Sequence, residues 1–221
     1  MLVLAAMVGV LQAAPPHQPR LHPQPRVNFT DTVNDALQDF LSTVEDPFHF
    51  KHRLTLNVGE PGATFDLLLT MDNTTLAGVK DLRVTNAEGF PASKDIMVTI
   101  NAPILTLQTP AYFINGSMVN HLEIEGEGPA TIILENLDLI LTGVVSDFTL
   151  SPLTMQFSEV ALDLELWQWT VAFENIMPGT DLGTVFNEFF SMCGPELMDM
   201  WEIKINNEDK LLNFINGLLP Q

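Results

Sequence analysis

The residues that could do chemistry in this chain are few, and they are not grouped as an active site requires. Glu123, Glu125 and Glu127 share one face of a predicted strand, just after His121, and three carboxylates in such a row could hold a metal ion. Acidic residues are in excess through the whole chain, so a solvated outer face explains the row better than a metal site. The sequence has no Gly-x-Ser-x-Gly, no His-Glu-x-x-His, no phosphate-binding glycine loop and no calcium-loop spacing. We therefore predict no enzyme activity, no cofactor and no metal site.

The remaining reactive side chains stand alone. His17 and His22 lie in a short proline-rich stretch without a third fixed ligand, a pattern typical of a linker. Cys193 is the only cysteine, so the chain cannot form an internal disulfide. Its apolar neighbours in the sequence favour a small buried side chain over a reactive thiol or a bridge to a second chain.

The charge of the chain excludes one class of partner. The formal net charge is −19, and all 28 acidic residues lie from Asp31 onward. Such a surface repels phosphate backbones, which excludes nucleic-acid binding, and it disfavours stable docking on anionic membranes. After the N-terminus, no run approaches the about 18 uncharged apolar residues of a membrane-spanning helix. The sequence predicts a soluble monomer without membrane insertion.

The N-terminus has the pattern of a secretory signal. Residues 1–13 form a predicted signal peptide, with an apolar stretch and small residues before a cleavage site after Ala13. Residues 14–27 are a proline-rich, acid-free tether, and residues 28–221 are long enough for a single domain with a proper core. Glycosylation sequons at Asn28, Asn73 and Asn115 agree with export. We predict a secreted, extracellular glycoprotein.

The elements that follow change from helix to sheet and back to helix. The apolar spacing predicts a helix over residues 31–45, which Pro47 ends, and a first strand over residues 54–58. Residues 63–173 read as strand after strand, separated by Asp-Asn, Glu-Gly, Asn-Gly, Gly-Glu-Gly-Pro and Ser-Pro turn signals. From residue 181 the period is helical again, with Gly194-Pro195 predicted to kink or split the helix. A second amphipathic stretch covers residues 207–219.

Part of the sheet is apolar on both faces. Residues 131–141 are apolar at odd and even positions, and residues 159–173 change the parity of their apolar side chains half-way. A sheet with one wet face should be apolar on one parity only. We interpret the second apolar face as the cover of a helix or of a carried molecule. The predicted fold class is α+β, a long curved antiparallel sheet wrapped around a long C-terminal helix.

Three stretches carry a resemblance to a known family. They are ATFDLLLTMDNTTLAGVKDLRVTN, APILTLQTPAYFINGSMVNHLEIEGEGPATIILENLDLILTG and VFNEFFSMCGPELMDMWEIKINNEDKLLNFINGLL. Their order, the Tyr-Phe-Ile-Asn-Gly hairpin before Ile-Glu-Gly-Glu-Gly and the Phe-Asn-Glu opening of the last helix resemble the takeout and juvenile-hormone-binding protein family of arthropods. The related group 7 mite allergens are the runner-up. The resemblance implies a super-roll, in which the sheet wraps a helix and forms a lipid-carrying tunnel.

One departure from the family bears on the pocket. Hormone carriers of this family usually hold an N-terminal arm by a disulfide near the ligand gate, whereas this chain has one cysteine far away at 193. This departure from the family favours a looser, less selective pocket over a tightly gated hormone site. The predicted ligand-binding residues are inward-facing apolar side chains of the sheet and the C-terminal helix: Phe65, Leu67, Leu69, Leu105, Leu107, Leu164, Leu166, Phe186, Phe189, Phe190 and Trp201.

The leading hypothesis for function is a secreted carrier of a lipophilic small molecule, such as a terpenoid or fatty acid. The first alternative is a secreted structural, interaction or allergen-type protein whose tunnel is filled by its own side chains. A second alternative, an innate-immune binder of bacterial lipid, would prefer a basic tip and is disfavoured by the acidic surface.

Overall fold

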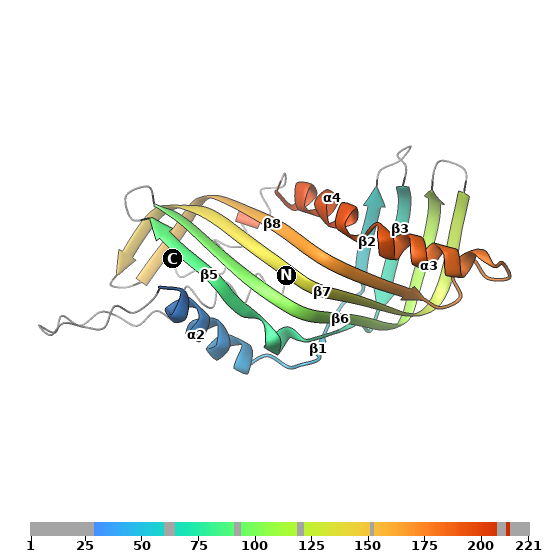
Figure 1. Ribbon diagram of the computed structural model, residues 1–221, viewed down its shortest axis with the longest axis horizontal. Helices are drawn as coiled ribbons and strands as arrows, with labels where there is room; N and C mark the ends of the chain where they lie inside the picture. Colours follow the sequence, from blue (N-terminus) through green and yellow to red (C-terminus); the bar gives the residue numbers. More distant parts are fainter. Residues whose placement is uncertain are drawn as a thin grey trace, which may run out of the picture.

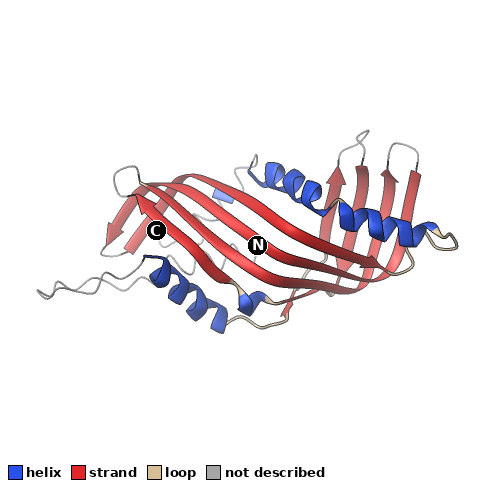
Figure 2. Cartoon of the chain, in the orientation of Figure 1, coloured by secondary structure: helices blue, strands red, loops and turns tan. Residues whose placement is uncertain are grey.

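The computed structural model describes residues 29–59, 65–90, 94–118, 122–150, 153–206 and 211–212. Within these ranges the chain forms one antiparallel sheet of eight strands, flanked by helices (Figure 2). The strands are β1 (Phe48–His49), β2 (Leu54–Gly59), β3 (Phe65–Asp72), β4 (Thr75–Ala77), β5 (Arg83–Phe90), β6 (Asp95–Met118), β7 (Leu122–Leu150) and β8 (Leu153–Phe173). The helices are α2 (Phe29–Ser42), α3 (Leu182–Met192), α4 (Gly194–Asn206) and the 3₁₀ turn η1 (Val79–Asp81). The predicted signal peptide, the whole of the tether and Asn28 lie outside the described residues.

Three long strands, β6, β7 and β8, form the body of the sheet. β7 pairs with β6 on one side and with β8 on the other. The opposite edge of β6 pairs in turn with β5, β4 and β3, and β2 extends the sheet beyond β3. Figure 1 shows the resulting curvature, with β2 and β3 turned steeply against the direction of β8. The curved antiparallel sheet that the sequence predicted is confirmed.

Helix α2 covers β5 at one end of the sheet (Figure 1). Leu37 and Leu41 are one helical turn apart and both are fully buried, as an amphipathic helix requires. Two polar side chains fix its position: the Gln38 amide nitrogen donates to the Leu82 carbonyl at 2.7 Å, and Asn34 Oδ1 accepts the Val84 N–H at 3.1 Å.

The C-terminal helix is divided, so one long wrapped helix is not what the structure contains. α3 ends at Met192 and α4 begins at Gly194, the position at which the sequence predicted a kink or a split. A Cβ on Gly194 would come within 2.5 Å of Trp169 Cγ, so the chain passes closer to β8 here than any other residue would allow. Within the predicted stretch 207–219, residues 211–212 are helical and the remainder lies outside the described residues.

Two turn signals were wrong, because the strands run through them. Asn115-Gly116 lies inside β6 and Gly126–Pro129 lies inside β7, where the two strands pair with each other as far as Met118 and Leu122. Gly128 has φ 147°, a conformation that glycine adopts without steric cost. At these positions glycine therefore lets a strand bend without ending it.

The sequence suggested that the apolar parity of residues 159–173 changes because a second face of the sheet is covered. The structure gives a different cause. In β6, β7 and β8 alike, two core-facing residues stand three positions apart, and the residues between them turn away from the core. The core-facing rows are Ala102–Leu137–Leu166 and, three residues further, Leu105–Leu134–Trp169. Between them Ile104, Asn136 and Trp167 are exposed, and Asn136 has a positive φ of 50°. Because residues three apart in a regular strand face opposite sides, this shared irregularity keeps one face of the sheet on the core.

The core consists of two apolar clusters along the sheet. The α2 cluster includes Leu37 and Leu41 of α2, Ile100 and Leu139 of the sheet, and Leu211. The α3 cluster gathers Leu67, Leu69, Ile114, Phe173, Phe186, Phe190 and Leu197 with further side chains of β6, β7 and β8. Leu134 and Leu166 pack against both clusters, which makes the apolar interior continuous.

Candidate functional site

The predicted ligand-binding residues divide between the two clusters. Leu67, Leu69, Phe186 and Phe190 are buried in the α3 cluster, and Leu107 and Phe189 are half-buried against it. Leu105 is buried in the α2 cluster, Leu164 packs against that cluster, and Leu166 contacts both. The side chains of Phe65 and Trp201 lie outside what the structure describes. The described members of the set therefore all line one apolar interior.

Aromatic rings fill the α3 end of this interior. Phe186 stacks on Phe190 with ring centroids 4.6 Å apart, and Phe190 meets the edge of Phe173 at 6.2 Å. Phe173 contacts Tyr112 at 4.8 Å, which continues the series to β6. Such ring pairs add stabilisation beyond their buried area. At this end the protein's own rings therefore pack against one another.

Tyr112 is the polar member of the aromatic series. Its ring is buried, and its hydroxyl donates a hydrogen bond of 2.7 Å to the Glu174 carbonyl. Burial raises the pKa of Tyr112 to about 12, with further contributions from the negative charges of Glu127 and Glu174. The neutral phenol is therefore strongly preferred in the folded protein.

Two threonine hydroxyls lie on the inside of the sheet. Thr109 is buried and satisfied, since its Oγ1 lies 2.6 Å from the Asp72 carbonyl and accepts the Ala111 N–H at 3.2 Å. Thr74 is 0% exposed, and its Oγ1 has no hydrogen-bond partner among the described residues. Thr74 immediately precedes the pairs Thr75–Gln108 and Leu76–Leu107, which places it near Thr109. A buried hydroxyl without a partner is costly, and it is the one polar feature of the described interior that calls for a bonding partner.

The outer edge of β8 is sealed by side chains of α3 and α4. Asn187 binds both main-chain groups of Phe173, and Ser191, one helical turn later, accepts the Val171 N–H. In α4, Glu202 accepts the Leu164 N–H, and Asn206 binds both main-chain groups of Leu162. The indole N–H of Trp169 donates to the Phe190 carbonyl at 2.9 Å, next to the break between the helices. Each helix thus presents polar residues four apart to a strand edge that would otherwise lack partners.

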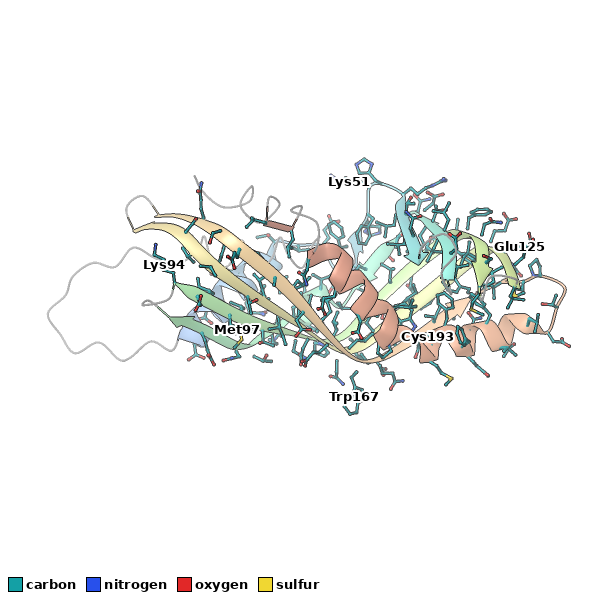
Figure 3. The ribbon with its side chains drawn as sticks, turned by 90° about the horizontal axis from the view of Figure 1, so that it is seen from above. Lys51, Lys94, Met97, Glu125, Trp167 and Cys193 are labelled. Atoms are coloured by element: carbon teal, nitrogen blue, oxygen red, sulfur yellow. The ribbon has the colours of Figure 1, made fainter. Side chains whose placement is uncertain are left out.

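A groove lies where the helix break meets the irregularity of β7 and β8. It has a volume of about 360 Å³. It is lined by Asn136, Asp138, Asp163, Leu164, Glu165, Leu166, Trp167, Pro195 and Asp199. Figure 3 shows Trp167 pointing away from the sheet and Cys193 at the junction of the helices. The sequence did not indicate this groove, because Trp167 was read as part of a covered face and proves to be 80% exposed.

The other residues that the sequence singled out lie apart from the interior. Glu123, Glu125 and Glu127 are exposed on β7, and His121 lies outside the described residues. No group of three His, Cys, Asp or Glu side chains within the described ranges is placed to hold a metal ion. Asn73 and Asn115 are both exposed. Cys193 is half-buried against the α3 cluster.

Comparison with known proteins decides the family. A model of the haemolymph juvenile hormone binding protein family matches residues 25–217. The chain belongs to this family. The resemblance drawn from the sequence is thereby confirmed.

Solved structures agree with the fold. The chain is similar to takeout 1 of Epiphyas postvittana, with a TM-score of 0.59 and 15% identity over 86% of this chain and 92% of that one. Lipopolysaccharide binding protein gives a TM-score of 0.33 and 9% identity over 82% of this chain and 38% of that one, too distant to support an argument. No curated protein matches the sequence. None of the described helices has the length and apolar character needed to cross a membrane.

Proposed function

We propose that this chain is a secreted carrier that binds an elongated lipophilic small molecule, such as a terpenoid or a fatty acid, inside its curved sheet. The observation that carries the proposal is the continuous apolar interior: Leu134 and Leu166 connect the α2 cluster with the α3 cluster. Membership of a family described as juvenile hormone binding supports the same class of cargo.

The cargo is best accommodated at the α2 end and the junction. Leu134, Val160, Leu164 and Leu166 pack against the α2 cluster but are only half-buried, so this apolar row is incompletely covered. A ligand that covered the row would remove apolar surface from water, worth about 25 cal/mol per Å² before the costs of association. At the α3 end the rings of Phe186 and Phe190 stack on each other, so less apolar surface is left there for a ligand to cover.

Those stacked rings also support a second candidate function. If aromatic side chains fill the whole interior as they fill the α3 end, the chain is a secreted structural or interaction protein without a cargo. Native mass spectrometry of the purified, deglycosylated protein distinguishes the two. A co-purifying lipid mass supports the carrier, and repeated empty spectra support the filled interior.

Uptake of a fluorescent fatty-acid or terpenoid analogue tests the position of the cargo. Leu164→Phe adds volume to the half-buried row and is expected to reduce uptake severalfold. Phe113→Ala is the matched control, because Phe113 is exposed on β6 and should leave uptake unchanged. If the wild type binds no analogue and carries no lipid, the carrier proposal is wrong.

Secretion has its own test. Protein from a eukaryotic host should shrink on enzymatic deglycosylation, since Asn73 and Asn115 are both exposed. The double variant Asn73→Gln, Asn115→Gln should keep only the shift that Asn28 contributes. If the wild type showed no shift, the case for secretion would rest on the N-terminal signal pattern alone.

A further inference from the structure

The outer face of the sheet carries an exposed aromatic ring beside a glycosylation sequon. Phe113 and Asn115 are two residues apart on β6, so their side chains project from the same face, about 7 Å apart along the strand. Phe113 is 46% exposed, and Asn115 is exposed as well. Ile114, which stands between them, points into the core and is buried. The ring of Phe113 therefore lies outside the interior, within reach of a group attached to Asn115.

A second apolar side chain borders the same asparagine. Leu68 of β3 is paired directly with Asn115 and is also exposed. The Cβ atoms of directly opposed residues are about 4.5–5.5 Å apart, and diagonal neighbours such as Leu68 and Phe113 are about 7–8 Å apart. Leu68 and Phe113 thus form a small apolar patch around Asn115, which we call the Asn115 patch.

The backbone under the Asn115 patch is held in place. Gly116 has φ 151°, and a Cβ at this position would collide with the Asp66 carbonyl of β3. The close approach of the two strands therefore requires glycine here. β6 pairs with both β3 and β7 as far as Met118, so the sequon lies on a strand with neighbours on both sides. A group that packs on this patch meets side chains whose spacing is already fixed, which lowers the entropy lost on contact.

The surroundings of the patch suit a neutral sugar. Glu125 and Glu127 of β7 are paired with Asn115 and Phe113, and both are exposed (Glu125 is labelled in Figure 3). Carboxylates accept hydrogen bonds from hydroxyl and amide N–H groups, and N-acetylglucosamine, the first sugar of an N-linked glycan, carries both. One face of its ring consists of C–H groups, which suit the electron-rich face of an aromatic ring. An apolar partner would instead bury these carboxylates at a high cost.

We propose that the first sugar of an N-linked glycan on Asn115 packs on Phe113 and Leu68, so that this glycan stabilises the folded sheet. The proposal rests on the secretion that the proposed function includes, because N-linked glycans are a feature of secreted chains. The sequon at Asn73 provides a contrast within the same protein. Two residues before Asn73 stands Met71, which is 1% exposed, so this sequon has no exposed ring in the corresponding position.

Thermal unfolding of protein from a eukaryotic host tests the packing, with peptide mass spectrometry to measure the occupancy of each sequon. Ser117→Ala removes the sequon of Asn115 and should lower Tm by about 2–4 °C, the effect of one aromatic contact in a chain of this size. In a Phe113→Ala background the same change should lower Tm much less, because the sugar has already lost its contact. Thr75→Ala removes the sequon of Asn73, and its effect should be the same with and without Phe113.

Two further measurements separate the sugar from the substitutions themselves. The same variants made without glycans in a bacterial host should show no coupling between positions 113 and 117. Trimming with an endoglycosidase that leaves one N-acetylglucosamine on each asparagine should keep the stabilisation, since the first sugar makes the contact. Phe113→Tyr retains a ring and should keep it too.

Four results would overturn the proposal. If Asn115 is occupied and loss of its glycan has the same effect with and without Phe113, the sugar does not use the ring. Coupling that persists in the bacterial protein would assign the effect to the side chains alone. Equal dependence on Phe113 for the glycans of Asn73 and Asn115 would exclude a specific patch. An unoccupied Asn115 would exclude the contact altogether. Absence of glycan at every sequon would also count against secretion, whereas lipid uptake by the unglycosylated protein tests the carrier separately.

Discussion

The side chain of Asn206 binds the main chain of Leu162 twice. Its Oδ1 accepts the Leu162 N–H at 2.8 Å, and its Nδ2 donates to the Leu162 carbonyl at 2.6 Å. Asn187 makes the same double contact with Phe173, at 2.9 Å and 3.1 Å. An asparagine amide carries one donor group and one acceptor, as a peptide unit does, so it can replace a neighbouring strand at a sheet edge.

Replacing Asn206 by Ala should therefore lower stability by about 1–3 kcal/mol, since two main-chain groups of a buried residue lose their partners. Asn206→Asp should be at least as damaging, because the carboxylate keeps the acceptor but faces the Leu162 carbonyl with another oxygen. Denaturant unfolding measures both. Gln168→Ala is the control on the same strand, because Gln168 is exposed. Stabilities that matched the control would mean that water replaces the amide without cost.

Tyr112 should make stability depend on alkaline pH. Its pKa is raised to about 12 in the folded protein, against the ordinary value of about 10 in an unfolded chain. The folded state thus favours the protonated phenol. The associated stabilisation is complete below about pH 10 and is lost as the pH rises toward 12.

The measurement is direct, because Tyr112 is the only tyrosine of the chain. Ultraviolet absorbance of tyrosinate should show a single titration near pH 12 in the native protein, and Tyr112→Phe should remove the part of the pH dependence of stability that comes from the phenol. A native titration at the ordinary value would show that the phenol is accessible to solvent.

Thr74 and Thr109 form a matched pair for testing the interior. Thr74→Val keeps the shape and removes an unpartnered buried hydroxyl, so stability should rise, by on the order of 1 kcal/mol. Thr109→Val removes a bonded hydroxyl and should lower stability by a similar amount. Thermal unfolding compares the two. A loss of stability in Thr74→Val would show that this hydroxyl has a partner in solution, such as an oxygen of a bound molecule.

Phe189 and Phe190 are neighbours on α3 with different surroundings. Phe190 is 2% exposed and contacts two rings, so Phe190→Ala should cost about 3–5 kcal/mol. Phe189 is half-buried, and Phe189→Ala should cost clearly less. Unfolding and analogue uptake are measured on the same samples. A fall in uptake with Phe189→Ala at nearly unchanged stability would extend the cargo site to the α3 end, which the stacked rings argue against.

Much of the fold could be predicted because it depends on local patterns. The stripe containing Leu37 and Leu41 identified α2, and Gly194-Pro195 identified the break between α3 and α4. Turn signals were less reliable. Asn115-Gly116 and Gly126–Pro129 mark bends inside β6 and β7, because glycine serves a sharp bend as well as a reversal.

The rest depended on several strands acting together. At Asn136, which has a positive φ, the side chains of β7 change the face of the sheet on which they lie. This change fits the core only because the paired residues of β6 and β8 change faces at the same level. A single strand's parity cannot show this. Likewise nothing in the sequence distinguishes Asn187, Ser191, Glu202 and Asn206 from the polar residues on the solvated side of a helix, although each bonds to β8. The groove beside Trp167 lies where the irregular strands meet α4, so the sequence did not indicate it either.

The sealed edge of β8 determines how the molecule behaves when it is stressed. If α4 detached while the sheet persisted, Leu162 and Leu164 would present bare main-chain groups, which any extended segment of another molecule could recognise. Addition of such segments would recreate the same vacancy on the next molecule and produce a growing fibre. The four polar side chains of α3 and α4 thus act as a safeguard against polymerisation, and their loss should appear first as turbidity during heating, before the sheet itself melts.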